Sequence, residues 1–213
     1  TEAIVLTEPT ALTTGVSSFT YPSGDNISCF GMNDGNIDLS ISGGSLAYSF
    51  LWNTGSTSED LTSLVAGAYD VTVTDINGCT SAENIVLTEP PAFISSVVQT
   101  NITCFGLSNG SIDYSITGGA PAYFVLWNTG AMTEDLSALT AGIYDVVVTD
   151  INGCTIADTV TLTEPALLTL SLDADSYPSG NNISCHGLND GGIDLTVAGG
   201  TPGYAILWNT GST

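Results

Sequence analysis

The chain of 213 residues contains no Lys and no Arg and a single His, against 22 acidic residues, so its formal net charge is -22. Without cationic side chains it cannot neutralise the phosphates of a nucleic acid, and it has nothing to attract it to an anionic membrane surface. No ion pair with Lys or Arg can form, so apolar burial, backbone hydrogen bonds and disulfides must stabilise the fold. The uncompensated carboxylates repel one another, which favours an extended shape and attracts cations from the medium.

Long apolar runs are also missing. No segment approaches the roughly 20 apolar residues that a membrane-spanning helix needs, and no charged segment followed by an apolar one opens the chain. No window of about 11 residues shows the period of an amphipathic helix. We therefore expect no membrane insertion in this segment, and a secondary structure made of strands and turns.

What is present is a repeat. Trp52, Trp127 and Trp208 each lie in the motif Leu-Trp-Asn-Thr-Gly, at spacings of 75 and 81 residues, and other motifs recur at the same two spacings. A fixed period of this length is typical of an array of small domains. The predicted division is residues 1–9 as the last strand of a preceding repeat, 10–90 as a long repeat, 91–165 as a short repeat and 166–213 as a truncated long repeat. We expect the chain to be one stretch of a longer array.

Within a repeat, apolar and polar residues alternate with a period of two, which predicts half-buried strands. The first repeat shows this over 37–41, 48–52 and 69–73, a turn over 75–78 and a further strand over 79–87. Many short strands separated by turns predict an all-β fold, an extended array of tandem immunoglobulin-like β-sandwich domains. The predicted core residues are the three tryptophans and two tyrosines placed like the tyrosine corner of such sandwiches: Trp52, Trp127, Trp208, Tyr69 and Tyr144.

The five cysteines follow the repeat. Cys29 and Cys79 lie 50 residues apart in the first repeat, Cys104 and Cys154 lie 50 apart in the second, and Cys185 opens the third. We expect the disulfides Cys29–Cys79 and Cys104–Cys154, with Cys185 bonded to a cysteine beyond this chain. Buried reduced thiols and a metal-binding pair are the alternatives, although no Cys-x-x-Cys motif supports zinc. Disulfides would place the protein in an oxidising, extracellular compartment.

Acidic residues also recur at fixed places. They suit turns and solvated strand faces, since Asp in a turn bonds its own backbone. The alternative is calcium held between domains or chains, which has a motive because no cation of the protein offsets the carboxylates. Calcium is the only cofactor that the sequence suggests, and its candidate ligands are Asp38, Asp75, Asp113, Asp150 and Asp194.

Other motifs predict no chemistry. The lone His186 has Phe30 and Phe105 as its counterparts, so a catalytic role would leave the other repeats inactive. We expect no catalytic site. The pattern Asn-x-Ser/Thr at Asn26, Asn101, Asn109 and Asn182 fits glycosylation, but short matches are common in Ser/Thr-rich chains and these suit loops equally well.

The motifs together resemble the SprB-type repeat. They run from Cys-Phe-Gly through Gly-Gly-x-x-x-Tyr, Leu-Trp-Asn-Thr-Gly and Ala-Gly-x-Tyr-Asp-Val to Thr-Asp-Ile-Asn-Gly-Cys, although His186 replaces the Phe in the third repeat. Such repeats occur in tandem in very large surface adhesins of gliding Bacteroidota. The resemblance implies an immunoglobulin-like or PKD-like domain, secretion to the cell surface and a filament or stalk role in adhesion or gliding motility. It supplies no catalytic residue.

The expected function is therefore a structural repeat array of an extracellular filament or adhesin. Its expected partners are neighbouring repeats, and lateral copies of the chain in a filament and surface glycans are further candidates. The alternatives are a glycan- or calcium-binding module of a secreted protein, and a spacer beside an enzyme domain outside this chain.

Overall fold

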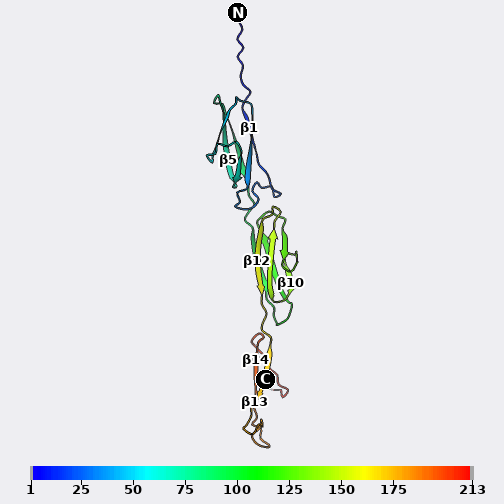
Figure 1. Cartoon of the computed structure of the whole chain (residues 1–213). Helices are drawn as coiled ribbons and strands as arrows, with labels where there is room; N and C mark the ends of the chain where they lie inside the picture. Colours follow the sequence, from blue (N-terminus) through cyan, green and yellow to red (C-terminus); the bar gives the residue numbers. More distant parts are fainter. Residues whose placement is uncertain (1, 212–213) are drawn as a thin grey trace.

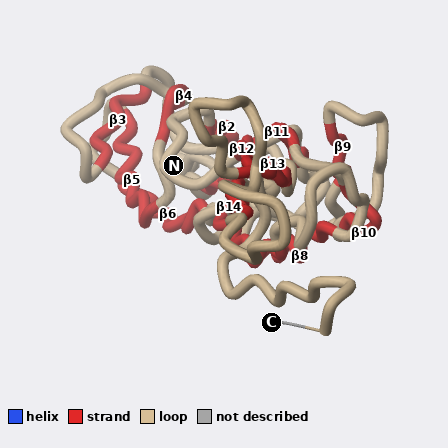
Figure 2. Tube along the Cα trace, turned by 90° about the horizontal axis from the view of Figure 1, so that it is seen from below, coloured by secondary structure: helices blue, strands red, loops and turns tan. Residues whose placement is uncertain are grey.

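A computed structural model of the chain describes residues 2–211. Two complete domains and a third, smaller unit follow one another from the N-terminus to the C-terminus, so the molecule is long and narrow (Figure 1). The described residues form strands and loops and no helix (Figure 2), which confirms the predicted all-β fold. Nothing within 2–211 is a helix long and apolar enough to cross a membrane.

Each complete domain is a pair of three-stranded antiparallel sheets. In the first domain one sheet has the order β1-β2-β4 and the other β3-β5-β6. The strands are β1 (Thr13–Ser17), β2 (Gly35–Ser42), β3 (Tyr48–Trp52), β4 (Leu61–Leu64), β5 (Gly67–Asp75) and β6 (Thr80–Leu87). The alternation read from the sequence places every second residue of β2 and β5 on the inner face, between the two sheets.

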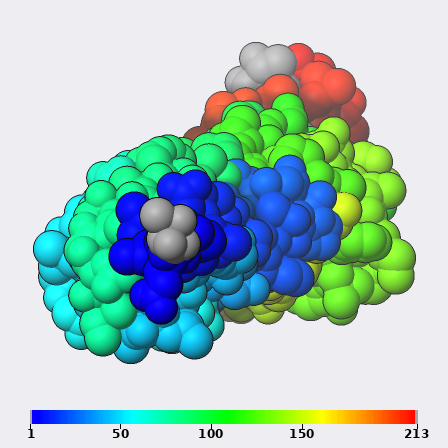
Figure 3. All heavy atoms as spheres, turned by 90° about the horizontal axis from the view of Figure 1, so that it is seen from above, coloured from blue at the N-terminus to red at the C-terminus, as the bar shows by residue number. Residues whose placement is uncertain are grey.

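The second domain repeats this arrangement, with the sheet orders β10-β8-β7 and β12-β11-β9. Its strands are β7 (Ile94–Thr100), β8 (Gly110–Thr117), β9 (Phe124–Trp127), β10 (Leu136–Leu139), β11 (Gly142–Thr149) and β12 (Thr155–Leu162). Seen from above, the second domain lies partly beside the first and is not hidden behind it (Figure 3). The two domains are therefore joined end to end with a lateral offset.

Each domain has a core of its own. Trp52 and Trp127 are each 2% exposed, and each indole N–H donates to a backbone carbonyl, that of Ser58 at 2.8 Å in the first case. Tyr69 is 7% exposed and its hydroxyl donates to the carbonyl of Val65 at 2.9 Å, which is the tyrosine-corner bond. Tyr144 donates in the same way to Thr140. No core residue is shared between the domains.

The two ends of the chain differ from expectation. Residues 2–9 form no strand, and Trp208 is half-buried outside any strand, although both were predicted to belong to β-sandwiches. The third unit holds only β13 (Thr169–Ala174) and β14 (Ile193–Ala198), paired as one sheet. A strand needs a neighbour to accept its hydrogen bonds, and no counterpart of β5 lies beside either segment. Residue 1 lies outside the described residues, and the assignments of 1–9 to a preceding repeat and of Trp208 to a sandwich core stay predictions.

Candidate functional site

The chain enters and leaves each domain at opposite poles. At the N-terminal pole of the first domain, the Gly44 N–H donates to the carbonyl of Thr10, and the Ser45 N–H donates to the carboxylate of Asp75. At the C-terminal pole, the N–H groups of Asn26 and Ile27 donate to the carbonyl of Thr88. Two segments therefore face opposite ways. The cysteine hairpin (75–79, and 150–154 in the second domain) lies at the N-terminal pole, and the cysteine loop (26–34, with counterparts 101–109 and 182–190) lies at the C-terminal pole.

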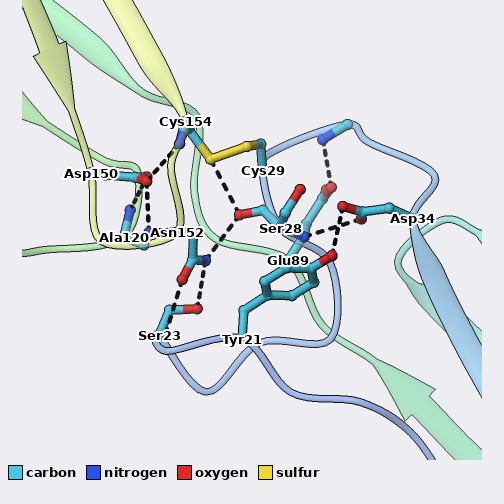
Figure 4. The surroundings of a disulfide bond; sticks show 11 residues. Tyr21, Ser23, Ser28, Cys29, Asp34, Glu89, Ala120, Asp150, Asn152 and Cys154 are labelled. Atoms are coloured by element: carbon cyan, nitrogen blue, oxygen red, sulfur yellow. Dashed lines mark hydrogen bonds between the residues drawn. A yellow bond between two sulfur atoms is a disulfide. The ribbon is translucent and has the colours of Figure 1, made fainter.

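The disulfide joins these two segments across the domain junction. Cys29 in the cysteine loop of the first domain is bonded to Cys154 in the cysteine hairpin of the second, with 5.8 Å between their Cα atoms (Figure 4). The expected pairs Cys29–Cys79 and Cys104–Cys154 were wrong. β6 alone spans about 25 Å at 3.2–3.4 Å per residue, which separates Cys79 from the opposite pole, whereas a disulfide needs Cα atoms roughly 4.4–6.8 Å apart. Cys79, Cys104 and Cys185 are exposed and carry no disulfide in the structure.

The linker between the domains is held from both sides. The N–H of Thr88 donates to the Asn26 side chain at 3.1 Å, and the carboxylate of Glu89 accepts the N–H of Gly31 at 2.6 Å. The carbonyl of Pro91 then accepts the N–H of Gly119 in the second domain at 2.8 Å. Only Pro90 lies between the two attachments, and its ring fixes its φ angle. The junction is therefore stiff.

The same linker recurs between the second domain and the third unit. Glu164 accepts the N–H of Gly106 at 2.7 Å, Thr163 bonds Asn101 and Ile102, and Ala166 accepts the N–H of Gly200 at 2.7 Å. This assigns a role to the recurring Leu-Thr-Glu-Pro motif. Its Thr and Glu fasten the chain to the cysteine loop behind it, and the residue after its Pro fastens the chain to the unit ahead.

Asn152 adds polar contacts across the first junction. Its side chain accepts the N–H of Ser23 at 3.1 Å and donates to the Ser23 hydroxyl and to the carbonyl of Ser28, each at 2.9 Å (Figure 4). Ser23 belongs to the loop that only the long repeats possess. A junction that follows the short repeat therefore lacks one of these two partners.

Asp34 fixes the shape of the cysteine loop of the first domain. Its carboxylate accepts the N–H of Ser28 at 3.1 Å and the hydroxyl of Tyr21 at 2.9 Å. Burial raises the pKa of Asp34, but the hydrogen bonds from Ser28 and Tyr21 outweigh it, so the pKa is lowered overall. The carboxylate stays ionised under ordinary conditions and keeps the loop beside the disulfide.

Two of the weak calcium candidates are used by the backbone. Asp150 is 2% exposed and accepts the N–H groups of Ala120, Asn152 and Cys154 at 2.8–3.0 Å. Asp75 does the same in the first domain, and the bond from the Cys79 N–H is the largest cause that lowers its pKa. These carboxylates shape the cysteine hairpins, as expected for Asp in a turn.

The other three candidates do not converge. Asp38, Asp113 and Asp194 are exposed on β2, β8 and β14, one in each unit. Across residues 2–211 no three acidic, Cys or His side chains are grouped so that they could hold a metal ion. Calcium binding stays a prediction for which this structure offers no built site.

The remaining motifs lie near the junctions. His186 is exposed in the cysteine loop of the third unit. The Asn26 side chain donates to the carbonyl of Phe19 and accepts the N–H of Thr88, and Asn101 accepts the N–H of Thr163. These asparagines therefore have structural tasks in the linker, whereas the sequence had suggested only loops or glycosylation.

Comparison with known proteins identifies the repeat. The family model of the SprB repeat matches residues 24–57, 96–132 and 180–213, which start in or beside the three cysteine loops and reach the Leu-Trp-Asn-Thr-Gly motifs. The chain carries three SprB-type repeats. In the two complete domains the matched SprB segments cover the cysteine loop, at least one strand of each sheet and the buried Trp, and the second half of each of these domains completes the sandwich.

Two further comparisons do not identify a function. A search of curated proteins finds no match. Among solved structures, the chain is similar to a C-terminal 282-residue fragment of intimin in complex with the intimin-binding domain of the translocated intimin receptor. The similarity has 11% identity and a TM-score of 0.36, and covers 83% of this chain and 69% of that one. At this level we build no argument on it.

Proposed function

We propose that this chain is a structural segment of an extracellular surface filament or adhesin, in which SprB-type repeats form a stiff spacer that serves adhesion or gliding. The observation that carries the proposal is the Cys29–Cys154 disulfide, which closes a junction already held by the clamped linker. A chain that only needed to connect two binding modules would gain nothing from fixing the angle between its domains. A spacer that must project a tip or transmit a pull needs such fixed joints.

The composition supports a place outside the cell. A structural disulfide persists in an oxidising compartment, and proteases that cut after Lys or Arg find no site in this chain. The mutual repulsion of the carboxylates keeps neighbouring filaments apart and soluble. The described residues offer no buried cluster of nucleophile and base, and the indoles of Trp52 and Trp127 are too deeply buried to stack on a sugar.

Localisation and shape test the proposal. Antibodies raised against residues 10–165 should label thin extensions on intact cells in immunogold electron microscopy, and small-angle scattering of the isolated chain should give a rod. Labelling confined to the cell interior, or a compact scattering profile, would refute it. Binding of the chain to a glycan array, lost when exposed Phe30 and Phe105 are both replaced by Ser, would favour the glycan-binding alternative instead.

A further inference from the structure

Each complete domain has a cysteine hairpin at its N-terminal pole and a cysteine loop at its C-terminal pole, and a disulfide between two such segments closes a junction. The first junction shows both segments bonded, because the cysteine loop of the first domain is joined to the cysteine hairpin of the second. In these two domains one loop and one hairpin have the same fold but no disulfide. They are the cysteine loop with Cys104 and the cysteine hairpin with Cys79, and both thiols are exposed.

The loop at Cys104 repeats the linker contacts of the bonded loop at Cys29. The N–H of Gly106 is held by Glu164 at 2.7 Å, as Gly31 is held by Glu89 at 2.6 Å. A groove of about 390 Å³ lies beside Cys104, lined by Phe105, the linker 165–168 and Gly200. The equivalent groove at Cys29 is lined by Phe30, Pro90, Phe93 and Gly119, and there Asp150 and Cys154 of the hairpin complete the wall. The groove at Cys104 is therefore equivalent to the groove at Cys29, except that no cysteine hairpin packs against it.

The hairpin at Cys79 likewise matches the bonded hairpin at Cys154. Asp75 accepts the N–H groups of Asn77 and Cys79, both at 2.9 Å, just as Asp150 accepts those of Asn152 and Cys154. The two hairpins differ in their surroundings. Asn77 donates to the hydroxyl of Ser45 in its own domain, whereas Asn152 bonds the preceding domain, and Cys154 is 9% exposed against that domain's loop whereas Cys79 faces solvent. The backbone at Cys79 is thus held by the same hydrogen bonds as the backbone at the bonded Cys154.

We propose that Cys104 bonds the cysteine hairpin of a following SprB-type unit and that Cys79 bonds the cysteine loop of a preceding one, so that every junction of the array is closed by the same disulfide. The inference rests on the proposed function only in requiring complete neighbouring units. In each closure the two thiols lose two protons and two electrons, which a disulfide-bearing oxidant of the export pathway accepts by thiol–disulfide exchange.

Such closure would give the array two interleaved covalent routes. The Cys29–Cys154 disulfide bypasses 125 residues, and Cys104, the start of the next bypass, lies inside them. A pull along the array would pass from Cys154 through the linker to Cys185 and then across the next disulfide. The residues of each domain that lie outside such connecting stretches would carry no load even if their domain unfolded. At ~3.3–3.6 Å per extended residue, each disulfide prevents about 40 nm of unfolded chain from extending under the pull.

Disulfide mapping of the native array tests the pairing directly. The array would be alkylated without reduction, cut after acidic residues and analysed by mass spectrometry, with the link between peptides 26–34 and 151–158 as the internal control. We expect the Cys104 peptide, which ends at Asp113, to be linked to a hairpin peptide of another unit, and peptide 76–83 to a loop peptide of another unit. Alkylated Cys79 or Cys104, or a link between either of them and a cysteine of its own unit, would overturn the inference.

A tandem duplicate supplies a second test in which every partner has a known sequence. Two copies of residues 10–165 in series place a complete cysteine hairpin directly after the cysteine loop of Cys104. We expect Cys104 of the first copy to bond Cys79 of the second, and Cys104→Ser to abolish that link alone. Bonding of Cys79 to Cys29 within one copy would contradict the pairing rule. Neither result depends on where the array resides, so failure here and failure of the proposed function are distinguishable.

Single-molecule pulling tests the mechanical consequence. In the reduced array, each unit of about 75 residues should release roughly 25 nm on unfolding. In the oxidised array those steps should vanish and return when reductant is added. Steps of equal length in both states would show that the disulfides do not bypass the domains.

Discussion

Removal of the inter-domain disulfide should destabilise both domains by an amount that the topology fixes. The proposed change is the double variant Cys29→Ser and Cys154→Ser, because a single change would leave a thiol able to mispair. Suppose that the second domain unfolds while the first stays folded. The unfolded chain is then attached to the first domain at two neighbouring points, the disulfide at Cys29 and the linker at Glu89, because Glu89 is bonded to Gly31 in the cysteine loop. The closed loop then has about 65 residues, which corresponds to about 4 kcal/mol in the chain-entropy model.

Calorimetry measures this effect. For domains of this size, 1 kcal/mol shifts the midpoint of thermal unfolding by roughly 4–8 °C, so we expect a decrease of roughly 15–30 °C at pH 7. The same shift should follow reduction and alkylation of the unchanged chain.

The matched control is the double variant Cys79→Ser and Cys104→Ser, which also replaces two thiols and touches no disulfide. Its unfolding midpoint should stay within a degree or two of that of the parent. If the control fell as far as the first variant, the disulfides would lie within the repeats and the reasoning would be refuted.

Three further outcomes are expected. Gly118→Ala should lower the free energy of unfolding, measured in urea, clearly more than Gly130→Ala does. Both glycines have a positive φ, but a Cβ added at 118 would lie 1.7 Å from the carbonyl oxygen of Ala92, whereas nothing lies within 4 Å of one added at 130. Equal losses of stability in the two variants would refute this. The backbone bond from Cys79 lowers the pKa of Asp75 in the folded state, so its contribution is present above the unfolded pKa of roughly 3.9 and is lost as the pH falls through the folded value. The parent should therefore lose its stability advantage over Asp75→Asn as the pH falls below about 4, and an advantage independent of pH would count against it. Sodium chloride should raise the midpoint of thermal unfolding steadily, because salt screens only the repulsion between carboxylates in this chain. Ca²⁺ should raise the midpoint no more than Mg²⁺ does at equal ionic strength, and a larger rise with Ca²⁺ would instead reveal a calcium site.

Most of the architecture could be read from the alternation of apolar and polar residues. That alternation places β2, β3 and β5 and their counterparts because their inner faces are almost entirely apolar, and the turn that follows β5 places β6. β1 and β4 were not predicted, since Thr13–Ser17 and Leu61–Leu64 are short and rich in Ser and Thr, and their pairing partners lie far away in the sequence. Tertiary pairing, and no local pattern, makes them strands.

The cysteine pairing shows what the repeat alone conceals. An equal spacing of 50 residues in two repeats suggests a bond within each repeat, and it is equally compatible with a bond between them. The course of the chain through the folded domain decides the pairing. From Cys29 the chain runs along β2 to the N-terminal pole, comes back along β3 and β4, and reaches the N-terminal pole again along β5, just before Cys79. Only stacking of the next unit brings a second cysteine to the same pole.

The missing cations and the disulfide are linked by one physical argument. No Lys or Arg is present to pair with the recurring Asp and Glu, and several of these carboxylates instead accept a backbone N–H of a turn, a junction or a strand. Asp60 and Asp135 accept the N–H groups of Leu39 and Tyr114, and Glu89 accepts that of Gly31. Such bonds are short-ranged and local, so they shape a unit but attract no distant partner. Two units of the same negative charge repel, and no ion pair can hold their surfaces together. A covalent bond, placed where the clamped linker already sets the geometry, is then the strongest tie available between them, and it is one that high salt does not weaken.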